Sequence, residues 1–282
     1  MPVAQVSCRQ IAPIVGDTAG NRSRIADEAR RAAAEGARIV VFPELAAHGY
    51  SFTDESELRR LAERPDGTLL AEWHGLAREL DLVIVAGYAE LGEDGHVYNS
   101  AAIVDATGVL ATYRKAHLWD REHLMFTAGE DRPPVVETAF GRIGVLVCYD
   151  LEFPEWVRHV ALAGADLLCA PVNWPLYPRP EGERPAEIVR VQADASVNRM
   201  AIAACDRTGE DRAQPWLGGS VIVNADGFPL GNLILGRANA VSAEVDLADS
   251  RNKRISDHNH VLHDRRPELY GGILAETSKE QS

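Results

Sequence analysis

The sequence lacks the features that mark a membrane-spanning chain or a nucleic-acid-binding protein. Its longest apolar runs, such as LVIVAG at 82–87 and IGVLVC at 143–148, are far shorter than the roughly 20 residues that span a bilayer. Basic residues are few: 29 Lys and Arg stand against 42 Asp and Glu, for a formal net charge of −13. Because phosphate binding needs a basic face, this acidic balance argues against a nucleic-acid partner.

The first twenty residues also lack a basic segment followed by an apolar one, so we expect no secretory signal. The composition, with 46% hydrophobic and 25% charged residues, is typical of a soluble globular protein. We therefore expect a cytoplasmic protein with no membrane partner.

Cysteine is scarce as well, with four residues at positions 8, 148, 169 and 205. No two of them form a C-x-x-C pair, and four in 282 residues is too few for a disulfide scaffold. A cysteine inside an apolar run is most often a small buried hydrophobe, and we interpret Cys8, Cys169 and Cys205 in this way. Cys148 differs because it stands where an apolar run ends.

Patterns that would indicate a cofactor are missing or weak. The segment GRIG at 141–144 lacks the G-x-G-x-x-G spacing of a dinucleotide site. His258, His260 and His263 have a spacing that could bind zinc, but they lie in a polar stretch. We interpret that stretch as solvated or as part of an interface, and we predict no metal and no cofactor.

Strand-like apolar runs alternate with amphipathic helical stretches along the chain. Helices are predicted over 21–36, 54–64, 68–80, 154–164 and 185–199. Strands are predicted over 3–11, 37–44, 82–91, 97–106, 109–115, 134–140, 142–150, 166–174, 200–207, 218–225, 231–236 and 240–247. Helices that interleave with strands cover the faces of sheets, and the hairpin turns indicate mixed sheets. We therefore predict an α/β protein.

No linker-like change in composition divides the chain. We predict a single domain over 1–282 that includes a C-terminal tail from about residue 250. The stretch 171–185 holds five prolines and lies between two elements of similar character. We expect it to form a long loop, which is either inert surface or the wall or lid of a site.

Three predicted strands each end at a residue with reactive chemistry. Glu44 directly follows a buried strand, Lys115 ends another, and Cys148 ends a third just before a helix. Ligands of open α/β folds bind at the carboxyl ends of strands. A carboxylate whose pKa is raised by burial can deprotonate a thiol, and a lysine can stabilise the thiolate and an oxyanion. Sequence spacing alone does not show that these three residues meet in space. An acid after a strand is commonly a helix cap, and a lysine at a strand end is commonly exposed.

The residues around these positions closely resemble the three signatures of the nitrilase superfamily of carbon–nitrogen hydrolases. The matching segments are FPE at 42–44, YRKAHL at 113–118 and CYDLEFPE at 148–155, in the order found in the family. The likeness continues in GGS at 218–220 and DRRPELY at 264–270, and so covers nearly the whole chain. It implies a four-layer α-β-β-α sandwich of the nitrilase type, which suits the mixed strands and helices predicted above.

The resemblance implies Cys148 as the nucleophile, Glu44 as the general base and Lys115 as the cation that stabilises the oxyanion. The backbone N–H of Tyr149 is expected to be a second oxyanion donor. Together these groups would hydrolyse an amide to a carboxylic acid and ammonia through a thioester. The small-molecule amide is the expected partner, and neither a cofactor nor a metal is required.

Members of the family often position the substrate with a second glutamate between the lysine and the cysteine. Glu122 fits that place, and Asp120 and Glu130 are the alternatives nearby. Members also usually pair through the helix that follows the cysteine. We therefore expect a homodimer or a higher homo-oligomer with 154–164 in the interface.

The residues at 148–150, Cys-Tyr-Asp, differ from the Cys-Trp-Glu that nitrile-cleaving branches usually carry. This favours an amidase for short aliphatic amides; hydrolysis of an N-carbamoyl amine or of an ω-amide is the alternative, and a nitrilase is less favoured. Asn173 and Trp174 follow a strand end and are expected to wall the pocket, and Trp216 is a further candidate. If both tryptophans face the pocket, it is narrow and apolar; the alternative is that both pack in the core.

Two interpretations outside amide hydrolysis stay open. A non-catalytic member of the fold could act as a binding or assembly partner, but the intact set of Glu44, Lys115 and Cys148 argues for an enzyme. A thiol redox sensor fits an activated Cys148, but no resolving cysteine lies near it in sequence.

Overall fold

Helices and strands alternate along the part of the chain that the structure, a computed structural model, describes: residues 3–233, 235–237 and 239–274. The α-helices are α1 (Thr18–Ala34), α2 (Glu55–Leu61), α3 (Thr68–Leu80), α4 (Pro154–Leu162) and α5 (Ala186–Asn198). The short 3-10 helices are η1 (Asp120–Leu124), η2 (Cys148–Glu152), η3 (Asp249–Arg251), η4 (Pro267–Leu269) and η5 (Gly271–Leu274). The strands are β1 (Val3–Gln10), β2 (Ile39–Val41), β3 (Val83–Leu91), β4 (Val97–Asp105), β5 (Gly108–Arg114), β6 (Val135–Thr138), β7 (Gly141–Val145), β8 (Leu167–Pro171), β9 (Ala201–Cys205), β10 (Glu210–Asp211), β11 (Gln214–Pro215), β12 (Val221–Val223), β13 (Pro229–Leu230) and β14 (Asn239–Asp246).

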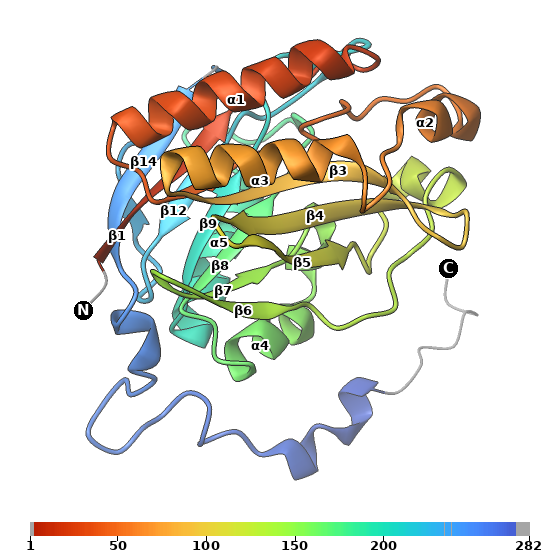
Figure 1. The fold of residues 1–282 in the computed structure, drawn as a ribbon. Coiled ribbons are helices and arrows are strands. Elements are labelled where there is room, and N and C mark those ends of the chain that lie inside the picture. Colours follow the sequence, from red (N-terminus) through yellow and green to blue (C-terminus); the bar gives the residue numbers. More distant parts are fainter. Residues whose placement is uncertain (1–2, 234, 238, 275–282) are drawn as a thin grey trace.

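Two six-stranded sheets pack against each other between two layers of helices (Figure 1). The first sheet has the strand order β14-β1-β2-β3-β4-β5, and the second has the order β13-β12-β9-β8-β7-β6. Each sheet contains parallel pairs at its centre, such as β2–β3 and β8–β9, and antiparallel pairs at its edges. Helices α1 and α3 cover the first sheet, and α4 and α5 cover the second. The predicted α-β-β-α sandwich with mixed sheets is confirmed.

The central strands are buried on both faces, which explains why they are continuous apolar runs in the sequence. In β2, Ile39 and Val41 belong to the core between the two sheets, whereas Val40 belongs to the core under α1 and α3. Successive side chains of a strand point to opposite faces, so a strand covered on both sides has no position for a polar residue. The polar residues that end these strands are therefore left at the rim of the sandwich.

Helix α1 begins at Thr18, three residues before the start predicted at position 21. Its N-cap is Asp17, whose side chain accepts a hydrogen bond from the backbone N–H of Gly20 at 3.1 Å. Such a cap satisfies one of the free N–H groups of the first turn, and so extends the helix to this point. Ile25 and Ala29 lie one turn apart on the buried face of α1.

The strand predicted over 231–236 is wrong. The strand in this region is β13, which precedes that segment and pairs with β12. Leu233 and Leu235 pack against the core between the sheets, but their backbone is not in a strand. Leu233 and Leu235 are therefore apolar because they pack on the core, not because they belong to a strand.

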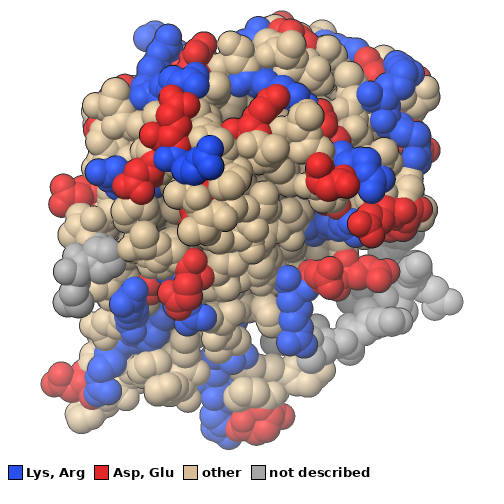
Figure 2. Space-filling model, viewed as in Figure 1, with Lys and Arg blue, Asp and Glu red and all other residues tan. Residues whose placement is uncertain are grey.

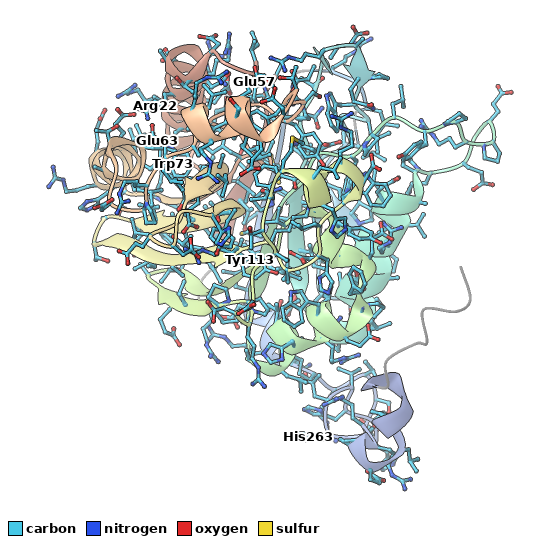
Figure 3. All side chains as sticks on the ribbon, turned by 90° about the vertical axis from the view of Figure 1, so that its right-hand side faces the viewer. Arg22, Glu57, Glu63, Trp73, Tyr113 and His263 are labelled. Carbon is cyan, nitrogen blue, oxygen red and sulfur yellow. The ribbon has the colours of Figure 1, made fainter. Side chains whose placement is uncertain are left out.

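After β14 and η3, residues 252–274 run outside the layers of the sandwich, on the side of α4 (Figures 1 and 3). His263 lies on this segment, and its ring stacks on that of His260 with 3.7 Å between the ring centroids. The backbone N–H groups of Leu262 and His263 approach His260 Nδ1 at 3.3 and 3.1 Å. In the described part of the chain, no group of three or more His, Cys, Asp or Glu side chains is arranged to hold a metal ion.

Acidic and basic side chains are interspersed on the face of the molecule shown in Figure 2, so opposite charges neighbour one another there. On α1, Arg22 forms ion pairs with Glu63 and with Glu72. Among the described residues, no helix has both the length and the apolar character needed to cross a membrane.

Candidate active site

The three predicted catalytic side chains come together where strands of both sheets end. Glu44 follows β2 and Lys115 follows β5 in the first sheet, whereas Cys148 follows β7 in the second. Lys115 Nζ donates a hydrogen bond to Glu44 Oε1 at 2.8 Å. Burial and then the charge of Glu44 raise the pKa of the Cys148 thiol, and the charge of Lys115 opposes them. The thiol is therefore protonated at rest and has a carboxylate close by.

Glu44 is buried, and its two carboxylate oxygens have different surroundings. Oε1 accepts hydrogen bonds from Lys115 Nζ at 2.8 Å and from Asn99 Nδ2 at 2.7 Å. Oε2 has no hydrogen-bond partner within the described part of the chain. Burial raises the pKa of Glu44 to about 7, against the opposing effect of the Lys115 charge. A carboxylate with a pKa near neutrality and a free oxygen can accept a proton at neutral pH.

Close packing of the backbone brings Glu44 to this place. Gly87 of β3 lies directly against the chain that follows β2: a Cβ at Gly87 would be 2.4 Å from the backbone nitrogen of Leu45 and 2.7 Å from Glu44 Cα. A side chain at position 87 would therefore push Glu44 out of the site.

The backbone at Cys148 is held in a strained conformation. Its φ of +46° lies in the left-handed region, which residues with a side chain rarely adopt and which is found at functional sites. The Sγ atom approaches the backbone oxygen of Asn173 at 3.7 Å. The side chain is partly exposed and lines a small cavity of about 40 Å³, so a small molecule can reach the sulfur.

Lys115 is enclosed between two carboxylates. Its Nζ lies 2.8 Å from Glu44 Oε1 and 2.8 Å from Glu122 Oε1. Burial disfavours the charged form, but the carboxylates of Glu122 and Glu44 outweigh it and raise the pKa of Lys115 above its ordinary value. The site therefore contains a fixed positive charge.

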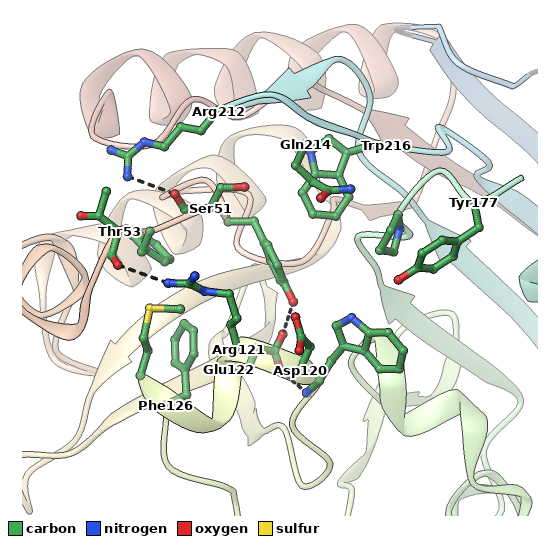
Figure 4. Close-up of a pocket in the computed structure, with 15 residues that line it drawn as sticks. Ser51, Thr53, Asp120, Arg121, Glu122, Phe126, Tyr177, Arg212, Gln214 and Trp216 are labelled. Atoms are coloured by element: carbon green, nitrogen blue, oxygen red, sulfur yellow. Dashed lines mark hydrogen bonds between the residues drawn. The ribbon is translucent and has the colours of Figure 1, made fainter.

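Glu122 lies where the sequence analysis expects the second glutamate. Tyr50 Oη donates to its Oε1 at 2.7 Å, and the backbone N–H of Trp119 donates to its Oε2 at 2.9 Å (Figure 4). Of the alternatives, Asp120 lines the larger cleft described below, and Glu130 is exposed. Only Glu122 of these three contacts Lys115 in the described structure.

The two residues expected to wall the pocket, Asn173 and Trp174, both line the small cavity beside Cys148. Asn173 is buried, and its Nδ2 donates to the backbone oxygen of Glu44 at 2.9 Å, so it connects the second sheet to the first. Trp174 is also buried, and it lines the small cavity together with Cys148 and Tyr149. The proline-rich loop predicted over 171–185 is therefore a wall of this site.

A larger cleft of about 550 Å³ adjoins the small cavity (Figure 4). The residues that line both are Trp119, Pro175 and Tyr177. Trp216 lines the cleft, where it packs edge-on against Tyr50, and is not part of the small cavity. Asp120, Arg121 and Arg212 also line the cleft, so it is not apolar. The two tryptophans line different spaces, so the condition under which one narrow apolar pocket was expected is not met.

The sequence model of the carbon–nitrogen hydrolase family matches residues 5–255. The chain is a carbon–nitrogen hydrolase. It is 35% identical over 95% of its length to a protein named nitrilase of Pyrococcus abyssi, 99% of which is covered. It is also 35% identical over 83% of its length to 2-oxoglutaramate amidase of Bacillus subtilis, 87% of which is covered. A crystal structure of an amidase from Nesterenkonia sp. superposes with a TM-score of 0.79 at 26% identity, and the match covers 97% of each chain.

These likenesses confirm the membership in the nitrilase superfamily that the three motifs indicate. The site of this carbon–nitrogen hydrolase also contains polar residues that sequence reasoning missed, namely Tyr50, Asn99 and Asp150. Asn99 could have been recognised as a candidate site residue, because it is a polar amide inside the apolar run of β4. Asp150 lies within the signature segment 148–155, but its contacts, like those of Tyr50, join distant parts of the chain and leave no local pattern.

Proposed function

We propose that this carbon–nitrogen hydrolase is an amidase that cleaves a non-peptide amide to a carboxylic acid and ammonia through a thioester on Cys148. The observation that carries the proposal is the environment of Glu44, whose pKa is raised by burial to about 7 and whose Oε2 has no partner within the described structure. A proton acceptor of this kind beside a thiol and a fixed cation is what nucleophilic attack on an amide needs.

In the first half of the reaction, Glu44 takes the Cys148 proton as the sulfur attacks the amide carbon. The negative charge that develops on the carbonyl oxygen is held by the Lys115 ammonium and by the backbone N–H of Tyr149. When the tetrahedral intermediate collapses, the C–N bond breaks and Glu44 returns the proton to the leaving nitrogen. Ammonia departs and a thioester remains on Cys148.

In the second half, water attacks the thioester. Glu44 takes one proton of the water, the same two donors hold the oxyanion, and the C–S bond breaks to release the acid. The Cys148 sulfur regains its proton from Glu44, so the enzyme returns to its starting state. Glu122 is the residue we propose to orient the amide, since it lies between Lys115 and the larger cleft.

The small cavity supports a short aliphatic amide as the substrate. Its volume of about 40 Å³ is a few times the 10–15 Å³ that one water molecule needs, so it admits only a small acyl group. The Nesterenkonia amidase gives independent support, because a variant of that protein carries the acetamide moiety of fluoroacetamide on its active-site cysteine.

A second candidate is the hydrolysis of an N-carbamoyl amine or of an ω-amide. The cleft of about 550 Å³ that adjoins the small cavity supports it, because a longer substituent could extend past Trp119 into that space. N-carbamoylputrescine amidase of Solanum lycopersicum and 2-oxoglutaramate amidase of Bacillus subtilis are among the relatives of this chain.

The protein is also proposed to form a homodimer in the cytoplasm through the helix that follows the nucleophile, α4. Large apolar side chains on α4 and its neighbour α5 support this, because Leu162, Val189 and Val197 are each close to half exposed. Light scattering of the purified protein measures the mass of the assembly, and a monomer would contradict the proposal.

The test of the function is ammonia release from acetamide, propionamide, ω-amides of dicarboxylic acids, N-carbamoyl amines and the matching nitriles. We expect the short amides to turn over, Cys148→Ala to abolish turnover, and Cys8→Ala, which alters a buried cysteine of β1, to retain it. Turnover of nitriles alone would show that the reaction class is wrong. No turnover of any compound would favour a non-catalytic role for the fold.

A further inference from the structure

The catalytic side chains reach the site from two different sheets. Glu44 and Lys115 follow strands of the first sheet, and Cys148 follows a strand of the second. The hydrogen bonds of a sheet fix its strands relative to one another, but they do not fix one sheet relative to the other. The distance from the nucleophile to the cation therefore depends on contacts that cross between the sheets.

Asp150 makes such contacts with a carboxylate that is fully buried. Its Oδ2 accepts hydrogen bonds from the backbone N–H of Val147 at 3.0 Å and from the hydroxyl of Tyr113 at 2.9 Å. Its Oδ1 accepts from the backbone N–H of His117 at 3.1 Å and from His117 Nδ1 at 2.7 Å. Both oxygens are thus fully occupied by donors from the protein.

These donors flank the two catalytic groups that must act together. Val147 directly precedes Cys148, and Tyr113 and His117 stand on either side of Lys115. One carboxylate therefore joins the chain around Lys115 to the chain beside Cys148. It lines neither the small cavity nor the larger cleft, so no feature of the site places it against the substrate.

Neighbouring groups hold this connection in place. The Tyr113 hydroxyl also accepts a hydrogen bond from Trp156 Nε1 at 2.8 Å, which adds α4 to the network. The His117 ring stacks on Phe153 with 3.7 Å between centroids. Tyr113 lies in the interior of the molecule, where these elements meet (Figure 3).

We propose that Asp150 is a positioning residue that holds Lys115 in register with Cys148 for stabilisation of the oxyanion. The inference rests on the proposed function, because it takes Lys115 as the group that binds the oxyanion. Glu44 has its own link to the second sheet through Asn173, so loss of Asp150 leaves the base beside the thiol.

The substitution Asp150→Asn disturbs the connection between the chain around Lys115 and the chain beside Cys148 in either orientation of the new amide. Each carboxylate oxygen accepts from two donors, whereas an amide has a single oxygen. The NH₂ group must face either the two donors of His117 or those of Val147 and Tyr113. Asp150→Asn therefore keeps the size of the side chain and breaks one side of the connection.

Two reactions of Cys148 separate the position of Lys115 from the reactivity of the thiol. Amide hydrolysis forms an oxyanion, so it needs Lys115 in register. Alkylation by iodoacetamide forms a C–S bond and breaks the C–I bond; iodide leaves, the thiol proton passes to base, and no oxyanion forms. Alkylation therefore depends on Lys115 only through the effect of its charge on the thiol pKa, whereas amide hydrolysis also needs Lys115 to hold the oxyanion.

The experiment measures kcat and KM for acetamide, the rate of alkylation by iodoacetamide, and Tm. We expect Asp150→Asn to lower kcat by about 10- to 100-fold, the usual cost of a misplaced catalytic group, with KM unchanged and the alkylation rate lowered much less than kcat. The matched control is Asp166→Asn. Asp166 is also buried and accepts from Arg142 and Arg251, but it precedes β8, at the end of the strand away from the site.

Both variants are expected to lower Tm, and only Asp150→Asn is expected to lower the ratio of turnover to alkylation. The proposal is overturned by any of three results: full turnover in Asp150→Asn, an equal loss of turnover and alkylation in that variant, or the same ratio of turnover to alkylation in both variants. If Asp150→Asn does not fold, Tyr113→Phe is used instead, because it removes one of the four donors to Asp150. It is expected to lower the ratio of turnover to alkylation, and an unchanged ratio overturns the proposal. Wild-type protein without amide turnover refutes the proposed function instead.

Discussion

Replacement of Asn99 by alanine tests whether Glu44 is the base. Burial raises the pKa of Glu44 to about 7, and the hydrogen bond from Asn99 Nδ2 is one of the contacts that oppose this rise. The bond is 2.7 Å long and favours the charged carboxylate. Its removal in Asn99→Ala therefore raises the pKa of Glu44 further.

The size of the change follows from the energy of one hydrogen bond to a charged group, roughly 1.5–3 kcal/mol. Protonated Glu44 retains part of such a bond, and Asn99 also donates to Glu122 at 3.3 Å, so we take the lower end of this range. About 1.4 kcal/mol corresponds to about one pH unit.

The assay is the pH dependence of kcat/KM for a short amide. Glu44 must be ionised to take the thiol proton, so wild-type kcat/KM falls as the pH decreases through about 7. In Asn99→Ala the midpoint of this fall is expected to lie about one pH unit higher. Asn198→Ala is the control, because Asn198 is equally buried but donates to Asp194 within α5. A midpoint that stays in place or moves down in Asn99→Ala would refute the assignment of Glu44.

Three further predictions concern the cation, a buried acid and the cavity wall. Lys115→Met leaves the carboxylates of Glu44 and Glu122 buried without their cationic partner. Turnover is therefore expected to be lost, and the free energy of unfolding in urea is expected to fall by roughly 3–5 kcal/mol. Normal stability would contradict the ion pairs of Lys115 with the two carboxylates. Burial raises the pKa of Asp194 to about 7, so its ionisation destabilises the fold as the pH rises from the unfolded pKa of about 3.9 through 7. Asp194→Asn is therefore expected to raise Tm at pH 8 relative to wild type, and this gain in Tm is expected to be smaller at pH 5. Scanning calorimetry at both pH values measures the two Tm differences. Equal differences at pH 8 and pH 5 would count against a neutral Asp194. Trp174→Ala enlarges the cavity beside Cys148, so ammonia release from bulky arylamides is expected to rise relative to propionamide, and an unchanged ratio would show that Trp174 does not limit the acyl group.

The positions of Glu44, Lys115 and Cys148 at strand ends could be predicted because each lies where a strand-like run stops. Glu44 follows the fully buried strand β2, Cys148 comes shortly after β7, and Lys115 directly follows the partly buried β5. The hairpin turns indicated mixed sheets, and the family resemblance carried by the three motifs implied the sandwich.

The contacts between these residues could not be predicted in the same way. Glu122, Asp120 and Glu130 are close in sequence, and only the turn of η1 decides which of them reaches Lys115. The contact of Asp150 with Tyr113 joins two sheets and depends on how they pack.

Errors in the predicted elements have a similar cause. Leu233 and Leu235 pack on the core without being in a strand, so the apolar run of the sequence imitates a strand there. The early start of α1 follows from the cap at Asp17, a polar residue that the Ala-rich helical pattern does not include. In both cases the hydrophobic pattern reports burial, whereas hydrogen bonds decide where an element begins and ends.

The location of the site at the seam between the two sheets has a consequence for thermal inactivation and for protein engineering. A small slide of one sheet on the other separates the sulfur from its partners while each sheet stays intact. Activity is therefore expected to disappear at lower temperature or lower urea concentration than the circular dichroism of the strands. For the same reason, repacking residues such as Val6 or Val145 in the core between the sheets is expected to alter kcat without contact with the substrate. We therefore expect the core between the sheets to influence the reaction geometry as well as the stability.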